Sequence, residues 1–277
     1  MAERAKVTTA DIRARKPHVG KKAAEGGAQK IAAITAYDYT FARLVDAAGV
    51  DIILVGDSLG MVMMGLPNTI GVTMADMLHH TAAVSRAKPR ALLVADMPFL
   101  SYHGAPERAL DNAGRLLQWG GAEAVKLEGG VDIGDTVRTL VQANIPVMGH
   151  VGLNPQAVHH LGGFHVQGRG QDAEQVLEDA RAVSEAGAFS LILEAIPAAL
   201  AAHITEAVHI PTIGIGAGPH CDGQILVLQD LLGLYDELAP KFAKVYAPLG
   251  EQVKATVTQY VQEVTEGTFP TDEHCYK

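Results

Sequence analysis

The feature that most constrains the fold is a local unit in which a helix-terminating glycine leads straight into an apolar strand that ends in glutamate. It occurs in GGAEAVKLE (120 to 128) and again in EAGAFSLILE (185 to 194). Similar short apolar runs recur along the chain, bounded by turn residues and separated by segments of helical periodicity. In most of them the apolar residues are consecutive rather than alternating, which is typical of parallel strands covered on both faces. The runs are Ile31–Thr35, Ile52–Val55, Ala91–Ala95, Ala124–Leu127, Ile145–Met148, Phe189–Leu193, Thr212–Ile215 and the weaker Ile225–Leu228.

Seven or eight such units with no linker between them predict a (β/α)8 TIM barrel. A doubly wound open sheet is the alternative, because strand order cannot be read from a sequence. We expect a single domain over residues 1–277, with a short helical leader at Thr9–Arg15 and an amphipathic helix near the carboxyl end. Residues 267–277 read as irregular. The helix signals between the strands include Thr73 with Asp76 three residues on, close to a capping box, and Pro106 in a first helical turn.

Composition excludes several classes of protein. The chain has 277 residues, 48% of them hydrophobic, which is enough for a large core. Its formal net charge of −9 argues against a nucleic-acid partner, and no apolar run is long enough to span a bilayer. Two distant cysteines, Cys221 and Cys275, suit a reducing cytoplasm and exclude a disulfide framework.

The one basic stretch lies near the amino end. It could be a transit peptide or a solvated leader, and acidic interruptions with no following apolar core favour the leader. The basic residues are Arg13, Arg15, Lys16, Lys21 and Lys22, and the acidic ones are Glu3, Asp11 and Glu25.

Polar side chains collect where the expected strands end. In a barrel all the carboxyl ends of the strands meet at one mouth, where such enzymes carry out their chemistry. The residues there are Tyr37, Asp38, Asp57, Ser58, Asp96, Lys126, Glu128, His150, Glu194 and the glycine-rich 214–218.

Each of these residues has a structural explanation when it is taken alone. Asp57 or Asp96 could cap the following helix, Lys126 and Glu128 could form an ion pair at the barrel top, and His150 could be a hydrogen-bonded rim residue. Glu194 is harder to explain in this way, because it ends an apolar strand and precedes more apolar residues. An unpaired carboxylate there is costly and readily takes up a proton, as a general base does.

Taken together, the set indicates a hard divalent cation. Mg²⁺ prefers one or two carboxylates with waters and substrate oxygens, and Asp57 and Asp96 on adjacent strands could supply them. Lys126 and Glu128 lie two apart and so point to the same side of their strand, where a lysine suits an anionic substrate. A cation, a lysine and a further carboxylate that can act as a base together suit the removal of a proton from the carbon next to a carbonyl group.

The glycine-rich loop at 214–218 has two interpretations. It could cradle a phosphate, as loops after the last barrel strands do, or its glycines could permit a tight turn and a close backbone approach. It lacks the GxGxxG order and the trailing Lys-Ser/Thr of a nucleotide loop, which favours the turn.

Several ordered stretches resemble the ketopantoate hydroxymethyltransferase family. They run from about Ile31 to His274 and are ITAYDYTFA, VGDSLGM, ADMPF, VKLEGG, GHVGLNPQ, GGFHVQGRG, LEAIP, IPTIGIGAG and CDGQILV. Two positions depart from the usual pattern of the family: Gly71 stands where proline is usual, and Asn154 where threonine is usual. Neither falls on a residue assigned to chemistry.

The resemblance implies a Mg²⁺-dependent barrel enzyme of pantothenate and coenzyme A biosynthesis. It would transfer a one-carbon unit from 5,10-methylenetetrahydrofolate to 3-methyl-2-oxobutanoate and give 2-dehydropantoate. It further implies a homo-oligomer, a decamer. The roles it implies are metal ligation by Asp57 and Asp96 with Glu128 near the ion, binding of the substrate carboxylate by Ser58 and Lys126, proton removal by Glu194, and pocket positions for Tyr37 and His150.

Two other functions remain as alternatives at this point. One is a Mg²⁺-dependent lyase or mutase of the phosphoenolpyruvate mutase and isocitrate lyase type, which shares the oxo-acid chemistry. Those enzymes carry a catalytic cysteine in a loop, and neither Cys221 nor Cys275 stands in a matching motif. The other is a non-catalytic barrel that only binds an anionic metabolite.

Overall fold

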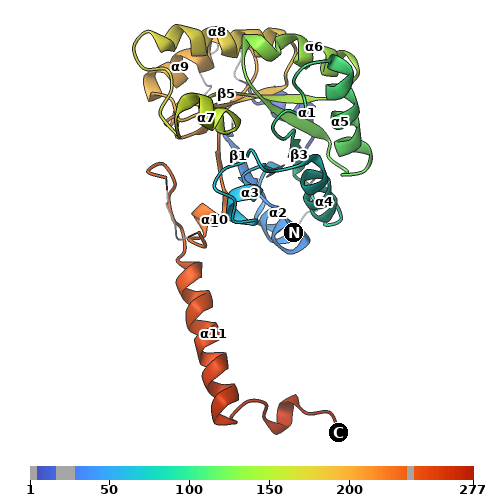
Figure 1. The fold of residues 1–277 in the computed structure, drawn as a ribbon, viewed down its shortest axis with the longest axis vertical. Helices are drawn as coiled ribbons and strands as arrows, with labels where there is room; N and C mark the ends of the chain where they lie inside the picture. Colours follow the sequence, from blue (N-terminus) through green and yellow to red (C-terminus); the bar gives the residue numbers. More distant parts are fainter. Residues whose placement is uncertain (1–4, 17–28, 236–239) are drawn as a thin grey trace. The chain divides into compact units, whose positions relative to one another are not determined.

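The structure, a computed structural model, describes residues 5–16, 29–235 and 240–277. Within these ranges parallel strands follow one another in chain order and close into a barrel, because β1 pairs with both β2 and β8 (Figure 1). The TIM barrel is thereby confirmed, and the doubly wound sheet is excluded. The strands are β1 (Ile31–Thr35), β2 (Ile52–Val55), β3 (Leu92–Asp96), β4 (Ala124–Glu128), β5 (Val147–Gly152), β6 (Ser190–Glu194), β7 (Thr212–Ile215) and β8 (Gly223–Leu226).

Both faces of the strands are buried, as the consecutive apolar residues predict. Ile52 and Leu54 of β2 join one core cluster with Leu92 of β3. Ile53 lies between them in sequence and is also fully buried. Since successive side chains of a strand point to opposite faces, one set fills the barrel and the other lies under the helices.

Some strand limits differ from the expected ones. The fifth strand begins at Val147 rather than Ile145, because Pro146 has no amide hydrogen to donate to the ladder. The Ile145 amide instead donates to the Leu140 carbonyl at the end of the preceding helix, at 3.0 Å. The strand also continues to Gly152, so His150 lies inside β5 rather than after it. The last strand begins earlier than expected, at Gly223, where a Cβ would come within 2.6 Å of the backbone of Ile31.

Helices connect the strands, and the predicted start signals are present. Thr73 and Asp76 form a complete capping box at α4, and Pro106 opens α5. The helices of this region are α2 (Tyr39–Ala48), α3 (Leu59–Val62), α4 (Met74–Ser85), α5 (Pro106–Gln118), α6 (Gly134–Gln142), α7 (Val158–Leu161), α8 (Asp172–Glu185) and α9 (Ala198–Ala207), with 3-10 turns η1 (Val131–Ile133) and η2 (Pro155–Ala157).

The amino-terminal segment packs against the amino ends of the strands. The expected leader helix is α1 (Thr9–Ala14), and its Ile12 is fully buried in the barrel core. Arg15 donates to both carboxylate oxygens of Asp51 at 2.7 Å, and Lys16 donates to Asp222 at 2.9 Å. Four charged residues of the predicted solvated leader lie outside the described residues: Glu3, Lys21, Lys22 and Glu25.

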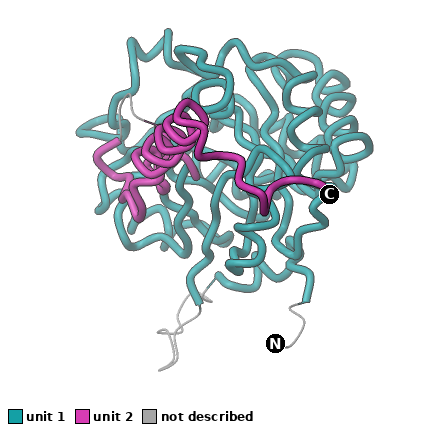
Figure 2. Tube along the Cα trace, turned by 90° about the horizontal axis from the view of Figure 1, so that it is seen from below, with its two compact units in different colours: residues 1–227 teal, residues 228–277 magenta. Residues whose placement is uncertain are grey.

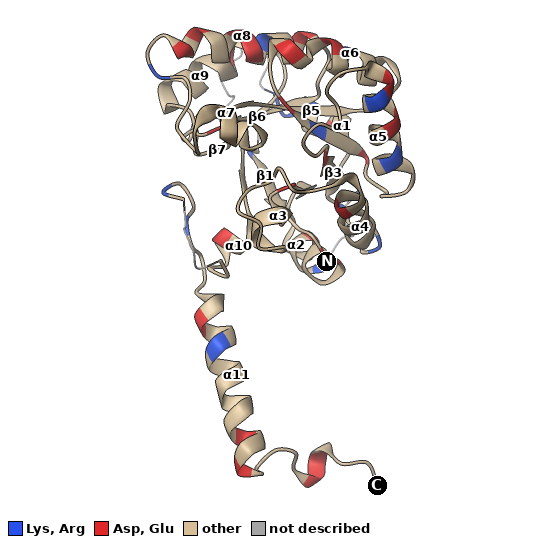
Figure 3. Ribbon diagram, viewed as in Figure 1, with Lys and Arg blue, Asp and Glu red and all other residues tan. Residues whose placement is uncertain are grey.

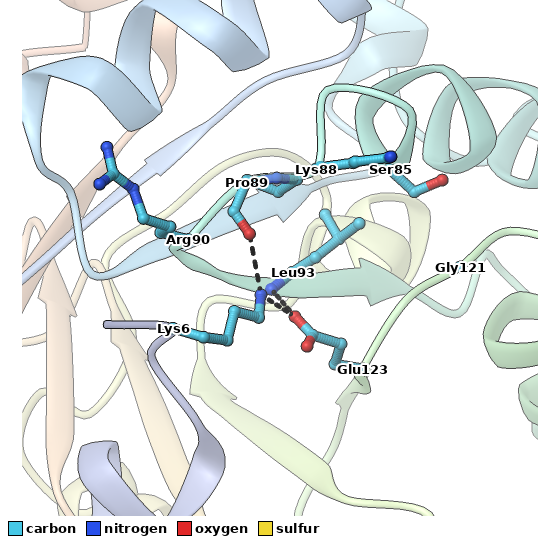
Figure 4. Close-up of a pocket in the computed structure, with 8 residues that line it drawn as sticks. All are labelled: Lys6, Ser85, Lys88, Pro89, Arg90, Leu93, Gly121 and Glu123. Atoms are coloured by element: carbon cyan, nitrogen blue, oxygen red, sulfur yellow. Dashed lines mark hydrogen bonds and ion pairs between the residues drawn. The ribbon is translucent and has the colours of Figure 1, made fainter. Parts of the chain in front are cut away.

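A cavity of about 440 Å³ lies beside this segment, at the amino ends of β3 and β4 (Figure 4). Lys6 points toward Glu123 there and forms an ion pair with it. The same ammonium donates to the carbonyls of Pro89 and Ala91, at 3.1 and 2.8 Å. Because carbonyl and carboxylate groups of the protein already accept hydrogen bonds from the Lys6 ammonium, we interpret this end of the barrel as an attachment point of the amino-terminal segment.

The chain divides into two compact units, residues 1–227 and 228–277 (Figure 2). The barrel belongs to the first. The second contains α10 (Leu228–Leu231), the 3-10 turn η3 (Asp272–His274) and α11 (Leu249–Glu266), which is the expected carboxyl-terminal helix. The exposed large apolar residues of α11 are Val253, Val257, Tyr260, Val261 and Val264. The turn η3 lies in a stretch predicted to be irregular, and the hydroxyl of Thr271 contacts His274 Nδ1 there at 2.8 Å.

Acidic and basic residues are interspersed on the outer helices α5, α6 and α8 (Figure 3). Cys221 is buried, Cys275 is exposed, and both are free thiols, as expected. Among the described residues, no helix combines the length and the apolar character needed to cross a membrane.

Candidate active site

Six of the predicted polar side chains form one connected group at the carboxyl ends of β2 to β6. The pairing register explains why they meet. Asp96 lies beside Lys126 across β3 and β4, and Glu128 lies beside His150 across β4 and β5. The six are Asp57, Asp96, Lys126, Glu128, His150 and Glu194.

Lys126 lies at the centre of this group. Its Nζ is 3.0 Å from Asp96 Oδ1, 3.3 Å from Glu128 Oε1 and 3.1 Å from His150 Nδ1. Its side chain is only 4% exposed. The ion pair between Lys126 and Glu128 is therefore present, and their spacing of two residues puts both on one side of β4 as predicted. To bind a substrate, Lys126 would have to exchange one of these contacts.

Burial and mutual repulsion shape the protonation of the carboxylates. Burial raises the pKa of Asp57 well above its usual value, and the charges of Asp96 and Glu128 add to the rise. Burial also raises the pKa of Asp96, although Lys126 opposes it. Glu128 shows the opposite result: burial acts to raise its pKa, but Lys126 and His150 outweigh this and lower it to about 2. Burial alone would lower the pKa of Lys126, yet the surrounding carboxylates raise it.

The structure tests the helix-cap explanation for the two aspartates. The N-cap of α3 is Ser58, with no side-chain capping bond, and the N-cap of α5 is Ala105. Asp96 instead accepts a hydrogen bond from the backbone amide of Asp57 at 2.9 Å. Neither aspartate caps the following helix, so the helix-cap explanation is wrong for both.

His150 connects the lysine to Glu194. Its Nε2 lies 3.1 Å from Glu194 Oε2. Burial and Lys126 act to lower the pKa of His150, but the hydrogen bonds to Glu128 and Glu194 outweigh them and raise it to about 9. The unpaired carboxylate expected at Glu194 is in fact paired with this ring.

Tyr37 and Ser58 form a separate pair next to the group. The Tyr37 hydroxyl lies 2.9 Å from Ser58 Oγ, and the Tyr37 carbonyl contacts His80 Nδ1 at 2.7 Å. A Cβ at Gly56 would come within 2.8 Å of Ser58 Oγ and 3.4 Å of Asp96 Oδ2. Glycine at position 56 thus lets the hydroxyl and the carboxylate approach the same point of the backbone.

Sequence reasoning missed two members of the site, Gln156 and Tyr102. Gln156 Nε2 donates to Asp57 Oδ2 at 2.8 Å, and Gln156 N donates to Glu128 Oε2 at 3.1 Å. The Tyr102 hydroxyl donates to Gln156 Oε1, at 2.9 Å. Gln156 ends the stretch GHVGLNPQ just after β5, so the rule that gathers polar residues at strand ends could have found it. Tyr102 lies six residues beyond Asp96 and carries no such signal.

Comparison with known proteins identifies the family. A sequence model described as "Ketopantoate hydroxymethyltransferase" matches residues 14–272. The chain belongs to the ketopantoate hydroxymethyltransferase family. This match spans the eight residues to which the resemblance gives roles in the site, from Tyr37 to Glu194.

Curated relatives of this family resemble the chain over almost its whole length. A protein of Pyrobaculum aerophilum is 60% identical over 242 residues, which cover 87% of this chain and 92% of the relative. One of Moorella thermoacetica is 54% identical over 278 residues, covering 100% of both chains. Both are named 3-methyl-2-oxobutanoate hydroxymethyltransferase.

Solved structures share the fold at low identity. A 2,3-dimethylmalate lyase, of the PEP mutase/isocitrate lyase superfamily, is 19% identical with a TM-score of 0.59, covering 92% of this chain and 89% of its own. A phosphonopyruvate hydrolase, in complex with oxalate and Mg²⁺, is 13% identical with a TM-score of 0.57, covering 90% and 87%. At this identity the likeness shows the barrel fold alone.

The donor set of this ketopantoate hydroxymethyltransferase family member fits a small divalent cation. Three buried carboxylates, Asp57, Asp96 and Glu128, lie at this end of the barrel, and the one ammonium, Lys126, contacts Asp96 and Glu128. A bound cation would favour the ionised forms of Asp57 and Asp96, which burial disfavours. Asp96 Oδ1 is buried and, within the described residues, receives no well-aligned hydrogen bond. No three His, Cys, Asp or Glu side chains in the described ranges form a complete protein-ligated centre, but Mg²⁺ commonly uses one or two carboxylates with waters and substrate oxygens.

The glycine-rich loop after β7 is a tight turn in this family member. Gly216 and Gly218 have φ values of 65° and 79°, and a Cβ at Gly218 would come within 2.5 Å of Ala198 Cβ. These features favour the turn over the phosphate cradle. Of the two departures from the family pattern, Gly71 is exposed, whereas Asn154 lies two residues before Gln156 and begins η2 as its N-cap.

Proposed function

We propose that this protein transfers a hydroxymethyl unit from 5,10-methylenetetrahydrofolate to 3-methyl-2-oxobutanoate and produces 2-dehydropantoate. The observation that carries the proposal is the family match over residues 14–272, with relatives of that name at 53–60% identity. The charged group in the barrel mouth supplies suitable chemistry. In the overall reaction the C–H bond at the third carbon of the oxo acid gives way to a C–CH₂OH group, one water is consumed, and tetrahydrofolate is released.

Asp57 and Asp96 would hold a Mg²⁺ ion, with Glu128 close by. When bound, such an ion polarises a keto group and stabilises negative charge on its oxygen. Binding in a buried site strengthens these electrostatic effects, because little water is present to screen them.

Glu194 is the proposed general base. Its side chain is 16% exposed, so it is the most accessible carboxylate of the group. His150 Nε2 lies 3.1 Å from one of its oxygens, Oε2. Glu194 would take the proton from the third carbon of the oxo acid, and the resulting carbanion would attack the methylene carbon of the donor. Both C–N bonds of the methylene bridge would break, water would supply the hydroxyl oxygen, and the two folate nitrogens would take up the protons lost by water and by the oxo acid.

Ser58 and Lys126 are the proposed partners of the substrate carboxylate, with Tyr37 orienting the Ser58 hydroxyl. Lys126 can release the contact with Asp96 when a cation takes over that carboxylate, which frees an ammonium hydrogen for the substrate. This exchange keeps every buried charge paired throughout binding.

The test of the base is the variant Glu194→Gln. In deuterated water, NMR follows exchange of the hydrogen at the third carbon of 3-methyl-2-oxobutanoate. We expect wild-type protein to catalyse this exchange and Glu194→Gln to lose at least ~100-fold in rate, with Mg²⁺ affinity nearly unchanged. Glu178→Gln on the outer face of α8 is the matched control. Normal exchange in Glu194→Gln would remove Glu194 from the role of base.

One assay separates the proposal from its alternatives. Wild-type protein with tetrahydrofolate, formaldehyde and the oxo acid should form 2-dehydropantoate, whereas a barrel that only binds anions would form none. The lyase or mutase alternative draws support from fold alone, and Cys221 lies before β8, at the end of the barrel opposite the site. A cytoplasmic location and a decameric assembly stay predictions.

A further inference from the structure

Gln156 occupies a connecting position that the proposed reaction leaves unexplained. It lies in η2, directly after β5, and is 5% exposed. Its Nε2 donates both to Asp57 Oδ2 at 2.8 Å and to the Met97 carbonyl at 3.0 Å. Its backbone amide donates to Glu128 Oε2 at 3.1 Å. One residue thus connects the carboxyl ends of β2, β3 and β4.

The orientation of the Gln156 amide is fixed by its neighbours. The Met97 carbonyl can only accept, so it faces the NH₂ group of the amide. On the other side, the buried Tyr102 hydroxyl lies 2.9 Å from Gln156 Oε1 and 2.9 Å from the Glu128 carbonyl, and it accepts from the Glu128 amide at 3.3 Å. A flipped amide would place two acceptors against each other at Met97. The NH₂ group therefore faces Asp57.

This arrangement occupies one oxygen on each of two carboxylates. Asp57 Oδ2 accepts from the Gln156 side chain, and Glu128 Oε2 accepts from its backbone. With one oxygen already hydrogen-bonded, each carboxylate is less able to bind a single cation through both of its oxygens. Mg²⁺ takes single oxygens in a tight octahedron, whereas Ca²⁺ readily accepts both oxygens of a carboxylate.

We propose that Gln156 is a positioning residue that restricts Asp57 to a single free oxygen and so sets the preference of the site for a small divalent cation. The inference rests on the metal site of the proposed function. It assigns to the amide of Gln156 a selectivity role, which is distinct from packing alone.

The test compares Mg²⁺ and Ca²⁺ affinities by isothermal titration calorimetry on the full-length protein. Gln156→Met keeps the side-chain length and removes the hydrogen bond to Asp57. We expect Mg²⁺ affinity to fall about 10–100-fold. Because both oxygens of Asp57 are then free, Ca²⁺ affinity should fall much less, so the Mg²⁺ to Ca²⁺ affinity ratio should drop at least about tenfold.

Two further variants separate positioning from packing. Gln175→Met on α8 removes a surface hydrogen bond of the same kind, from Gln175 Nε2 to Asp179 at 3.1 Å, and should leave both affinities unchanged. Tyr102→Phe removes the hydroxyl that orients the amide and should shift the affinity ratio in the same direction as Gln156→Met, but less. A purely structural role would lower both affinities, or the unfolding temperature, without moving the ratio.

The outcomes distinguish this inference from the proposed function. An unchanged affinity ratio in Gln156→Met overturns the inference, whatever the wild-type activity. Mg²⁺ binding with the expected ratio shift but no turnover of the oxo acid overturns the function and supports the inference. Wild-type protein that binds no Mg²⁺ overturns the role assigned to Gln156, even if it turns over the substrates.

Discussion

Lys126 is the residue on which the electrostatics of the mouth depends most. It is buried between Asp96 and Glu128. Water cannot reach these carboxylates to stabilise their charges if the lysine is removed. Removing one partner of a buried ion pair leaves an uncompensated charge, which is far more destabilising than the pair itself is stabilising. The stability of the metal-free protein should therefore respond strongly to this one side chain.

We expect Lys126→Met to lower the free energy of unfolding by about 3–5 kcal/mol at neutral pH without metal. Urea denaturation of wild-type and variant protein measures the difference. Lys254→Met on the exposed face of α11 is the control, with a change within about 0.5 kcal/mol. A loss below about 1 kcal/mol for Lys126→Met would show that Asp96 and Glu128 find other partners.

Among the elements, α4 shows how a sequence signal becomes a local stabilising feature. The Thr73 hydroxyl accepts from the Asp76 amide at 3.3 Å, and the Asp76 carboxylate accepts from the Thr73 amide at 2.9 Å. Bonds from the Thr73 hydroxyl and then its backbone amide lower the pKa of Asp76 below the usual 3.8. A lowered folded-state pKa means that the contribution is complete above about pH 3.8 and is lost as the pH falls through the lower folded value.

Asp76→Asn should therefore reduce stability by about 0.5–1 kcal/mol at pH 7, a modest figure because Asp76 is largely solvated. Urea denaturation of both proteins between pH 2.5 and pH 7 gives the difference. It should shrink below about pH 3.8, where the wild-type carboxylate also becomes protonated. A difference that stays constant over this range would mean that the ionised carboxylate contributes nothing to the cap.

For the whole molecule, the candidate site joins strands that lie far apart in the sequence. Its proposed ligands lie at the carboxyl ends of β2, β3 and β4, so a bound cation would stabilise the folded barrel and would have no matching site in the unfolded chain. Mg²⁺ at 100 times its Kd should stabilise the protein by about 2.7 kcal/mol, a rise of roughly 5–10 °C in the unfolding temperature.

Thermal unfolding with EDTA and then with Mg²⁺ measures this rise. Asp57→Ala should abolish most of it, because one proposed ligand is lost. If Asp57→Ala kept the full rise, the cation would bind elsewhere on the protein. A large loss of stability in Asp57→Ala that is independent of Mg²⁺ would instead assign a structural role to the carboxylate.

Local patterns in the sequence determined the class of fold, the strands to within a few residues, and the capping box of α4. These features depend on residues close together in the chain, so periodicity and cap chemistry reveal them. The polar residues at the strand ends were also predictable as a set, because parallel strands in a barrel expose their carboxyl ends on one side.

Only the tertiary structure decided which of these residues contact one another. Gln156 meets Asp57 across 99 positions of sequence, and Glu194 has His150 as a partner rather than an apolar surrounding alone. Barrel closure through β1 and β8 likewise leaves no local trace. The physical reason is that such contacts depend on strand register and barrel closure, which bring together side chains that are far apart in the chain. The residues next to each of them in sequence do not indicate which partner it will meet.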